Sequence, residues 1–224
     1  IGNPMYHWNH LELKRYFDYD GILSAKTADE VWNLCNEKLQ SDDMSACNII
    51  KKSNVKMIGT TDDPIDTLEW HKKIKEEGVC SALVLPSYRP DKAVNIDKDG
   101  FVDYIKALAA AADMEINSVA DVKTALIKRL DFFCEMGCKA TDHGLDYIPF
   151  AVGSEEEIEA AFKAVMNGEA ITAKQADMYK TAILVCLGKE YAKRGIVMQI
   201  HYSVQRNTNK AMFAKIGADT GFDT

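Results

Sequence analysis

The sequence predicts an α/β fold with about four parallel strands, which form part of a (β/α)8 barrel with extra helical segments. Amphipathic helices alternate along the chain with short apolar runs, which is the pattern of βα units and a parallel sheet. Three of these helices stop at a glycine, the residue that most easily takes the left-handed conformation at a helix end. Charged residues follow the apolar runs, as in barrels, whose sites lie at the carboxyl ends of the strands.

The first 53 residues are expected to be helical and to belong to the barrel domain. Helices are predicted over 4–17 and 28–39, with a shorter one near 46–52. The segment that begins at Thr27 resembles a capping box, in which a hydroxyl accepts a hydrogen bond from a backbone N–H three residues on. Thr27 is therefore expected to cap the second helix.

Residues 54–224 are expected to contain the βα units. Apolar runs predict strands over 55–59, 79–85, 138–140 and 196–200. The helices between them are predicted over 66–77, 118–136 and 172–194, with a helical insertion near 154–171. Capping-box patterns mark the helix starts at Ser118, Ser154 and Thr172. Four strands are half of a complete barrel, so the remaining strands are expected to lie outside this chain.

Composition and charge argue against several classes of partner. Apolar residues make up 47% of the chain and charged residues 27%, as in soluble globular proteins. No apolar run reaches the roughly 18 residues that span a bilayer, so no membrane partner is expected. The net charge is −7 and the cations form no block, so no nucleic-acid partner is expected. The six cysteines lack paired metal spacing and are interpreted as reduced thiols of a cytoplasmic protein.

Charged side chains at the predicted strand ends form the candidate site. In a barrel, such residues converge on one mouth although they are far apart in sequence. Arginine offers a fork of donors to a carboxylate, while Asp and His can bind hydroxyls, transfer protons or hold a divalent metal. The combination predicts a small anionic, polyhydroxylated substrate. The charged residues at these ends are Asp62, Asp63, Arg89, Asp91, Lys92, Asp142, His143, His201 and Arg206. The candidates for site roles are Asp62, Asp63, Arg89, Asp142, His143, His201 and Arg206.

Several of these candidates also have a structural interpretation. Asp62 and Asp63 precede a proline and could form a turn and a helix cap. Asp142 and His143 could form a capped turn, and His201 could be a hydrogen-bonded histidine of the core. The residues by themselves leave these alternatives open.

Several motifs resemble, in the same order, those of the uronate (glucuronate) isomerases, a family of the amidohydrolase superfamily. The segment YHWNHLELKRYF at 6–17 resembles the family's YHWTHLELxRYF. Further matches are TTDDP at 60–64, LPSYRPDK at 85–92, DHGLD at 142–146, MQIH at 198–201 and GADTGFD at 217–223. The matches extend over essentially the whole chain, which makes them far more specific than any one motif.

This resemblance implies a (β/α)8 barrel that interconverts D-glucuronate and D-fructuronate, and D-galacturonate and D-tagaturonate, by aldose–ketose isomerisation in sugar-acid catabolism. Arg89 is the candidate for binding the substrate carboxylate. Catalytic roles are expected for Asp142, His143 and His201, and substrate-binding roles for Asp62, Asp63, Arg89 and Arg206. A cytoplasmic homo-oligomer acting on a small sugar acid is the expected form of the enzyme.

The sequence departs from the family at the metal site. The family is expected to use an H-x-H pair at its first strand and an Asp at its last, and the five histidines here contain no H-x-H. Ser203 also stands where the family often has glycine. One divalent metal, with zinc as the candidate, is therefore expected only in the full-length enzyme. The chain is expected to be a central part of such an enzyme, about strands two to five, and to be inactive alone.

Two other functions are compatible with parts of the sequence. A metal-dependent hydrolase of the same superfamily would attack an amide or ester with a metal-bound hydroxide. A helical interaction module would use residues 3–53 and 154–194 as a partner surface, but it does not account for the charge at the strand ends.

Overall fold

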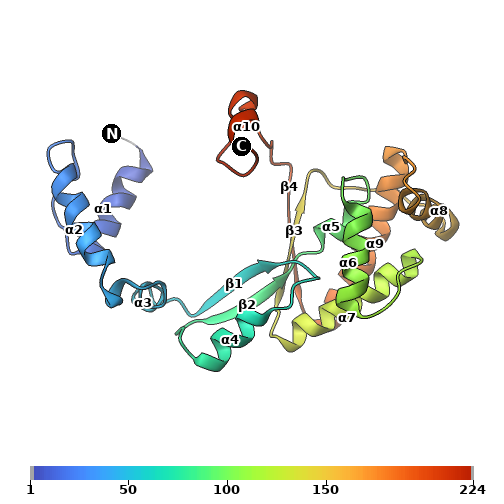
Figure 1. Ribbon diagram of the computed structural model, residues 1–224, viewed down its shortest axis with the longest axis horizontal. Coiled ribbons are helices and arrows are strands. Elements are labelled where there is room, and N and C mark those ends of the chain that lie inside the picture. The colour runs from blue at the N-terminus through green and yellow to red at the C-terminus, as the bar shows by residue number, and fades with distance from the viewer. Residues whose placement is uncertain (1–2, 223–224) are drawn as a thin grey trace. The chain divides into compact units, whose positions relative to one another are not determined.

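Four strands form one sheet in the order β1-β2-β3-β4, which confirms the α/β fold class (Figure 1). The computed structural model describes residues 3–222. β2 pairs with β3, and β3 pairs with β4, in parallel. The strands are β1 (Met57–Asp62), β2 (Leu83–Tyr88), β3 (Ala140–Leu145) and β4 (Val197–Tyr202). The helices are α1 (Pro4–Phe17), α2 (Ala28–Leu39), the 3-10 helix η1 (Asp42–Met44), α3 (Ala46–Lys52), α4 (Glu69–Glu77), α5 (Asp91–Val94), α6 (Phe101–Ala112), α7 (Val119–Glu135), α8 (Glu155–Met166), α9 (Ala173–Arg194) and α10 (Lys210–Ile216).

Each strand lies further along the chain than its apolar run predicts. The third is predicted at 138–140 and observed at 140–145, and the first three are all displaced by at least two residues at their starts. Ladder hydrogen bonds join backbone groups whatever the side chain, so polar residues such as Asp142 continue a strand beyond its apolar part. Most of the charged candidates therefore lie within or directly after strands, where successive side chains point to opposite faces.

The helix starts follow the sequence more closely. Ser154 and Thr172 each form a complete capping box, with Glu157 and Gln175 as the reciprocal partners. The Ser118 hydroxyl likewise caps α7. These caps satisfy backbone N–H groups that a helix leaves without partners, so α7, α8 and α9 begin where the sequence predicts.

Two helix predictions are wrong in detail. Thr27 makes no side-chain cap on α2, because its hydroxyl donates to the carbonyl of Ile22 at 2.7 Å. Helix α4 begins at Glu69 and not at residue 66, because Leu68 has a left-handed φ of 54° and its N–H is held by Asp66 at 2.7 Å. Helices α5, α6 and α10 and the short η1 have no sequence-based prediction.

The chain divides into two units of dense internal contact, residues 1–58 with 73–84 and residues 59–72 with 85–224. In the first unit, α1 and α2 contact each other and bury Leu13 and Val31. The predicted division at residue 53, with the helical segment assigned to the barrel domain, stays a prediction. Within 3–222, no helix is long and apolar enough to cross a membrane.

The core of the second unit lies between the sheet and the helices α5 to α9, which gather beside β3 and β4 in Figure 1. Tyr88 at the end of β2 is fully buried, and its ring meets Phe133 at 5.1 Å and Tyr191 at 6.3 Å between centroids, both edge-on. Its hydroxyl donates to the carbonyl of Leu126 at 2.8 Å. Aromatic packing of this kind stabilises the layer of helices against the sheet.

Phe133→Ala is expected to lower the free energy of unfolding by about 3–5 kcal/mol, because truncating a fully buried aromatic residue leaves a cavity beside its neighbours. Phe150→Ala serves as the control, since that ring is 76% exposed and its loss should change stability little. Urea denaturation of both variants checks the expectation. Equal losses for the two would contradict this description of the core.

Candidate active site

The strands β3 and β4 present polar side chains on one face of the sheet, named here the open face. On β3 the residues at 141, 143 and 145 are buried toward the helices, so Asp142 and Gly144 lie on the opposite side. The parallel register places Gln199 beside Asp142 and His201 beside Gly144. Partnered residues of neighbouring strands share a face, and the open face therefore carries all four.

Asp142 is the centre of this face, and both of its carboxylate oxygens have several partners. His201 Nε2 lies 2.8 Å from Oδ1, and Gln199 Nε2 donates to the same oxygen at 3.4 Å. On the other side, Thr61 Oγ1 donates to Oδ2 at 3.1 Å and Arg89 Nη1 lies 3.5 Å from it. These five residues are named the Asp142 cluster. They come from β1, from the end of β2, from β3 and from β4.

Arg89 is held by a second carboxylate, that of Asp91 at the start of α5. Arg89 Nε donates to Asp91 Oδ2 at 2.8 Å, and the backbone N–H of Gly144 donates to the same oxygen at 3.0 Å. The side chain of Arg89 is 36% exposed, and that of Asp91 only 15%. The guanidinium is therefore fixed on one edge and accessible on another.

Gly144 allows this close arrangement. A Cβ atom built at this position would collide with Nη2 of Arg89 and would lie 2.9 Å from Cε1 of His201. Real Cβ atoms almost never approach that closely, so any other residue would have to displace both side chains. The glycine thus brings an arginine and a histidine to the same spot on the open face.

The ion pair between Arg89 and Asp91 affects the pKa of both groups. Burial raises the pKa of Asp91 above its usual range, which its hydrogen bonds from Arg89 and Gly144 oppose. Burial would lower the pKa of Arg89, but its contacts with Asp91 and Asp142 raise it, so the guanidinium stays charged. Asp142 Oδ1 and His201 Nε2 lie 2.8 Å apart, a distance at which a carboxylate and an imidazole can exchange a proton.

Four of the predicted site residues lie elsewhere. Asp62 points to the other face of β1, where Thr60 Oγ1 donates to it at 2.6 Å and His71 Nε2 lies at 3.7 Å. Asp63 accepts a hydrogen bond from the Tyr104 hydroxyl at 2.7 Å, and its side chain also closes the turn that follows. These contacts indicate that Asp62 and Asp63 stabilise the chain around the end of β1. Their substrate-binding roles stay predictions.

Arg206 and His143 are also outside the cluster. Arg206, in the segment after β4, is exposed and forms an ion pair with Asp219. His143 is fully buried on the helix side of β3, with its ring 5.7 Å from that of Tyr191. Neighbouring residues of a strand point in opposite directions, so Asp142 and His143 do not share one pocket as the sequence analysis expects. The catalytic role of His143 stays a prediction.

Three residues of the site had no predicted role: Thr61, Asp91 and Gln199, although Asp91 is among the charged residues at the predicted strand ends. For Gln199 the signal is the period of two along a strand, since this residue stands two residues before His201. Asp91 stands two residues after Arg89, but only the fold shows that its carboxylate turns back to the guanidinium.

The residues present do not make a complete metal site. Within 3–222, no group of three or more His, Cys, Asp or Glu side chains lies close enough to hold a metal ion. Asp142 and His201 could supply two ligands, but a metal needs at least three protein ligands for firm binding in a catalytic zinc site.

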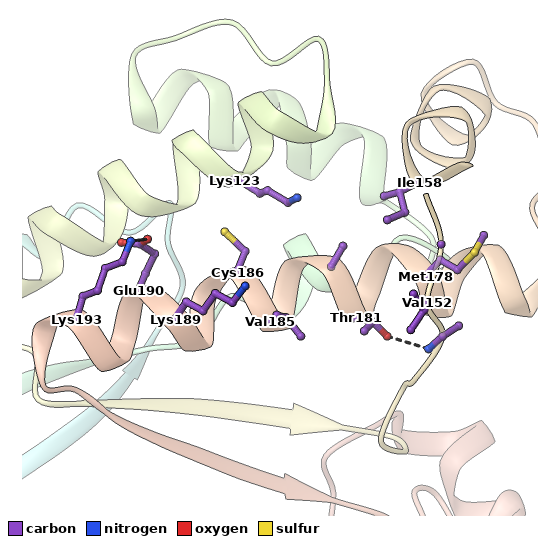
Figure 2. A pocket seen from close by; sticks show the side chains of 13 residues that line it. Lys123, Val152, Ile158, Met178, Thr181, Val185, Cys186, Lys189, Glu190 and Lys193 are labelled. Atoms are coloured by element: carbon purple, nitrogen blue, oxygen red, sulfur yellow. Dashed lines mark hydrogen bonds and ion pairs between the residues drawn. The ribbon is translucent and has the colours of Figure 1, made fainter. Parts of the chain in front are cut away.

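A cavity of about 400 Å³ lies between α7 and α9 and is closed at one end by α8 and residues 151–153 (Figure 2). Val152, Met178 and Val185 contribute apolar surface to its lining, and Lys123 and Lys189 contribute charged side chains. Among the residues that line it, none belongs to the Asp142 cluster. The cavity in the helix layer and the candidate site on the sheet are therefore separate features.

Comparison with protein families gives one match over the whole length. A family model described as glucuronate isomerase matches residues 1–224. The chain is 52% identical over 223 residues to a protein named uronate isomerase from Lachnospira eligens, and 51% identical to one of the same name from Lachnoclostridium phytofermentans. Each match covers 100% of this chain and 48% of the relative. The chain thus spans about half the length of the curated relatives it matches.

Solved structures give the same result for the fold. The crystal structure of a uronate isomerase from Thermotoga maritima matches with a TM-score of 0.91 at 32% identity, over 100% of this chain and 49% of that one. A glucuronate isomerase from Caulobacter crescentus matches with a TM-score of 0.88 at 26% identity, over 100% of this chain and 46% of that one. Both similarities extend over all of the elements described above.

Proposed function

The chain belongs to the glucuronate isomerase family, and we propose that it supplies part of the active site of a uronate isomerase. The full enzyme would interconvert D-glucuronate and D-fructuronate, and D-galacturonate and D-tagaturonate, by aldose–ketose isomerisation in sugar-acid catabolism. The observation that carries the proposal is the Asp142–His201 contact of 2.8 Å on the open face, with Arg89 beside it. The names of the relatives support the same reaction.

The proposed chemistry uses the Asp142–His201 pair for proton transfer. In the open-chain aldose, the carboxylate of Asp142 takes the proton from C2, while a protonated His201 gives a proton to the carbonyl oxygen on C1. The resulting enediol receives the first proton back at C1, and His201 takes the proton from the hydroxyl on C2. The product is the ketose, and both side chains return to their starting states.

Arg89 is proposed to bind the sugar acid through the edge of its guanidinium that the two carboxylates leave accessible. A carboxylate or hydroxyl oxygen of the substrate would accept from this edge, since arginine is fitted to planar oxygen pairs. Thr61 and Gln199, which both donate to Asp142, are proposed to contact substrate hydroxyls beside that carboxylate. Binding on the open face would keep the substrate next to the proton-transferring pair.

The rest of the site is proposed to come from the other half of a full-length protein. One divalent metal, with zinc as the candidate, would be held by residues outside this chain and would polarise the substrate's oxygens when bound. We also propose a cytoplasmic homo-oligomer, since all six cysteines are free thiols and several large apolar side chains are exposed.

The test is an assay of glucuronate and galacturonate isomerisation by a full-length protein that carries this chain. Turnover is expected for that protein, and none for the 224-residue chain alone. Arg89→Met is expected to raise KM by about 10- to 100-fold, because a charge-assisted hydrogen bond to the substrate is lost. The control is Arg194→Met, which removes a guanidinium at the end of α9 whose partners are Asp131 on α7 and Glu190 on α9.

An unchanged KM in Arg89→Met would refute the binding role, and absence of turnover by the full-length protein would refute the function. The same assay separates the isomerase from a metal-dependent hydrolase of neutral amides, for which Arg89 would have no purpose. The family match and the named relatives favour the isomerase.

A further inference from the structure

A second polar group lies buried behind the Asp142 cluster. Within 3–222, three buried side chains have polar atoms without a hydrogen-bond partner and lie near one another: Asp91 through Oδ1, His143 through both ring nitrogens, and Tyr191 through its hydroxyl. His143 Nδ1 lies 4.0 Å from Asp91 Oδ1, and the rings of His143 and Tyr191 are 5.7 Å apart. Buried polar atoms are nearly always satisfied, so a group of them that is not satisfied calls for an explanation.

Asp91 connects this buried group to the open face. Its Oδ2 accepts hydrogen bonds from Arg89 Nε at 2.8 Å and from the N–H of Gly144 at 3.0 Å. Its Oδ1 is turned toward His143, which belongs to the same strand as Gly144 and points to the other side. Whatever fixes Oδ1 therefore also fixes the direction from which Oδ2 holds the guanidinium.

We propose that His143 and Asp91 are positioning residues, which hold Arg89 in place from the helix side of the sheet. The Nδ1–H of a neutral His143 would donate to Asp91 Oδ1. The observed 4.0 Å exceeds a hydrogen bond by about 1 Å, and hydrogen bonds in catalytic sites often tighten when the substrate binds. Burial lowers the pKa of His143 to about 4, which keeps the ring neutral and gives it one N–H.

A purely structural histidine in this protein looks different. His71 is also buried, but its Nε2 lies 2.7 Å from the Thr60 hydroxyl, so it already has a partner within the fold. His143 fills its place in the core without any such bond. An apolar ring would pack there without leaving polar atoms unsatisfied, so the imidazole is explained by what it does to Asp91.

This inference rests on the proposed function, and its first test is kinetic. In the full-length protein, His143→Phe is expected to raise KM for glucuronate about 10-fold with a much smaller change in kcat, because Arg89 loses its fixed position. His143→Asn keeps an N–H close to the place of Nδ1 and is expected to restore KM to within about 3-fold of wild type. Asp91→Asn should raise KM by itself, and adding His143→Phe to it should have little further effect.

Three outcomes would overturn the proposal: equal KM values for the Phe and Asn variants, an unchanged KM in Asp91→Asn, or a full additional effect of His143→Phe on the Asp91→Asn background. Should His143→Phe fail to fold, the Asn and Asp91 variants still decide the question. His71→Phe serves as the control, with an expected loss of thermal stability and an unchanged KM among its folded molecules.

A second readout does not depend on the enzyme's activity. The Nε–H resonance of Arg89, assigned by its absence in Arg89→Lys, is expected to shift in His143→Phe and to return in His143→Asn. If the full-length protein shows no uronate turnover while this pattern is present, the proposed function fails and the positioning inference stands. If turnover is present and the resonance does not respond to His143→Phe, the inference fails and the function stands.

Discussion

Asp142→Asn in the full-length protein is expected to lower kcat for uronate isomerisation by about 10²- to 10⁴-fold, the usual contribution of a group that transfers a proton in the reaction. Asparagine has nearly the same size and keeps one acceptor oxygen, so it can still accept a hydrogen bond from Thr61 or His201. The amide cannot take up a proton from C2 of the sugar. KM should change far less than kcat, because the binding groups remain.

The control for this variant is Asp146→Asn. Asp146 follows β3, lies largely exposed and pairs with Lys98 at 2.8 Å. Its replacement changes the net charge by the same amount and is expected to leave both kinetic constants close to wild type, since exposed ion pairs contribute little. If the Asp142 variant kept a kcat comparable to that of the control, Asp142 could not be the base.

The expectation for Asp142 comes from its partners and not from its charge alone. A carboxylate in contact with one histidine could be a simple ion pair. Here two further donors, Thr61 and Gln199, hold the same group in a fixed direction on the open face. Fixed geometry of this kind is what a proton-transferring group requires, because reacting atoms must be held close and aligned.

The starts of α7, α8 and α9 could be predicted from the sequence, because their signals are local. Capping boxes at Ser154 and Thr172 and the glycine after α9 depend on a few neighbouring residues, and they appear as expected. The strand bounds were less predictable. Backbone pairing continues through Asp142 and His143, and nothing in their side chains marks them as strand residues.

The candidate site was predictable in part for the same reason. Arg89, Asp142 and His201 carry recognisable chemistry at three strand ends, and they do come together. Which face a side chain occupies depends on the register of the strand, and a shift of one residue reverses it. The place of His143 behind the sheet and the return of Asp91 to Arg89 therefore required the structure.

Gly144→Ala is expected to lower kcat/KM about 100-fold while leaving the fold intact, since a displacement of about 1 Å in a catalytic group can cost that much in rate. The added methyl would have to displace Nη2 of Arg89 and the ring of His201. The first of these is the end of a flexible side chain, so it can move aside with little loss of stability. What is lost is the position of the guanidinium and the imidazole relative to Asp142.

Gly188→Ala in α9 is the matched control. Its added methyl would meet only the sulfur of Met198, at an ordinary 3.6 Å. Alanine in a helix interior should even stabilise the protein by about 0.5–1 kcal/mol, with activity unchanged. Steady-state kinetics and thermal denaturation of the two variants separate the effects. Similar activity in both variants would mean that the reaction does not require Arg89 and His201 to lie side by side. The open face would then not be the active site.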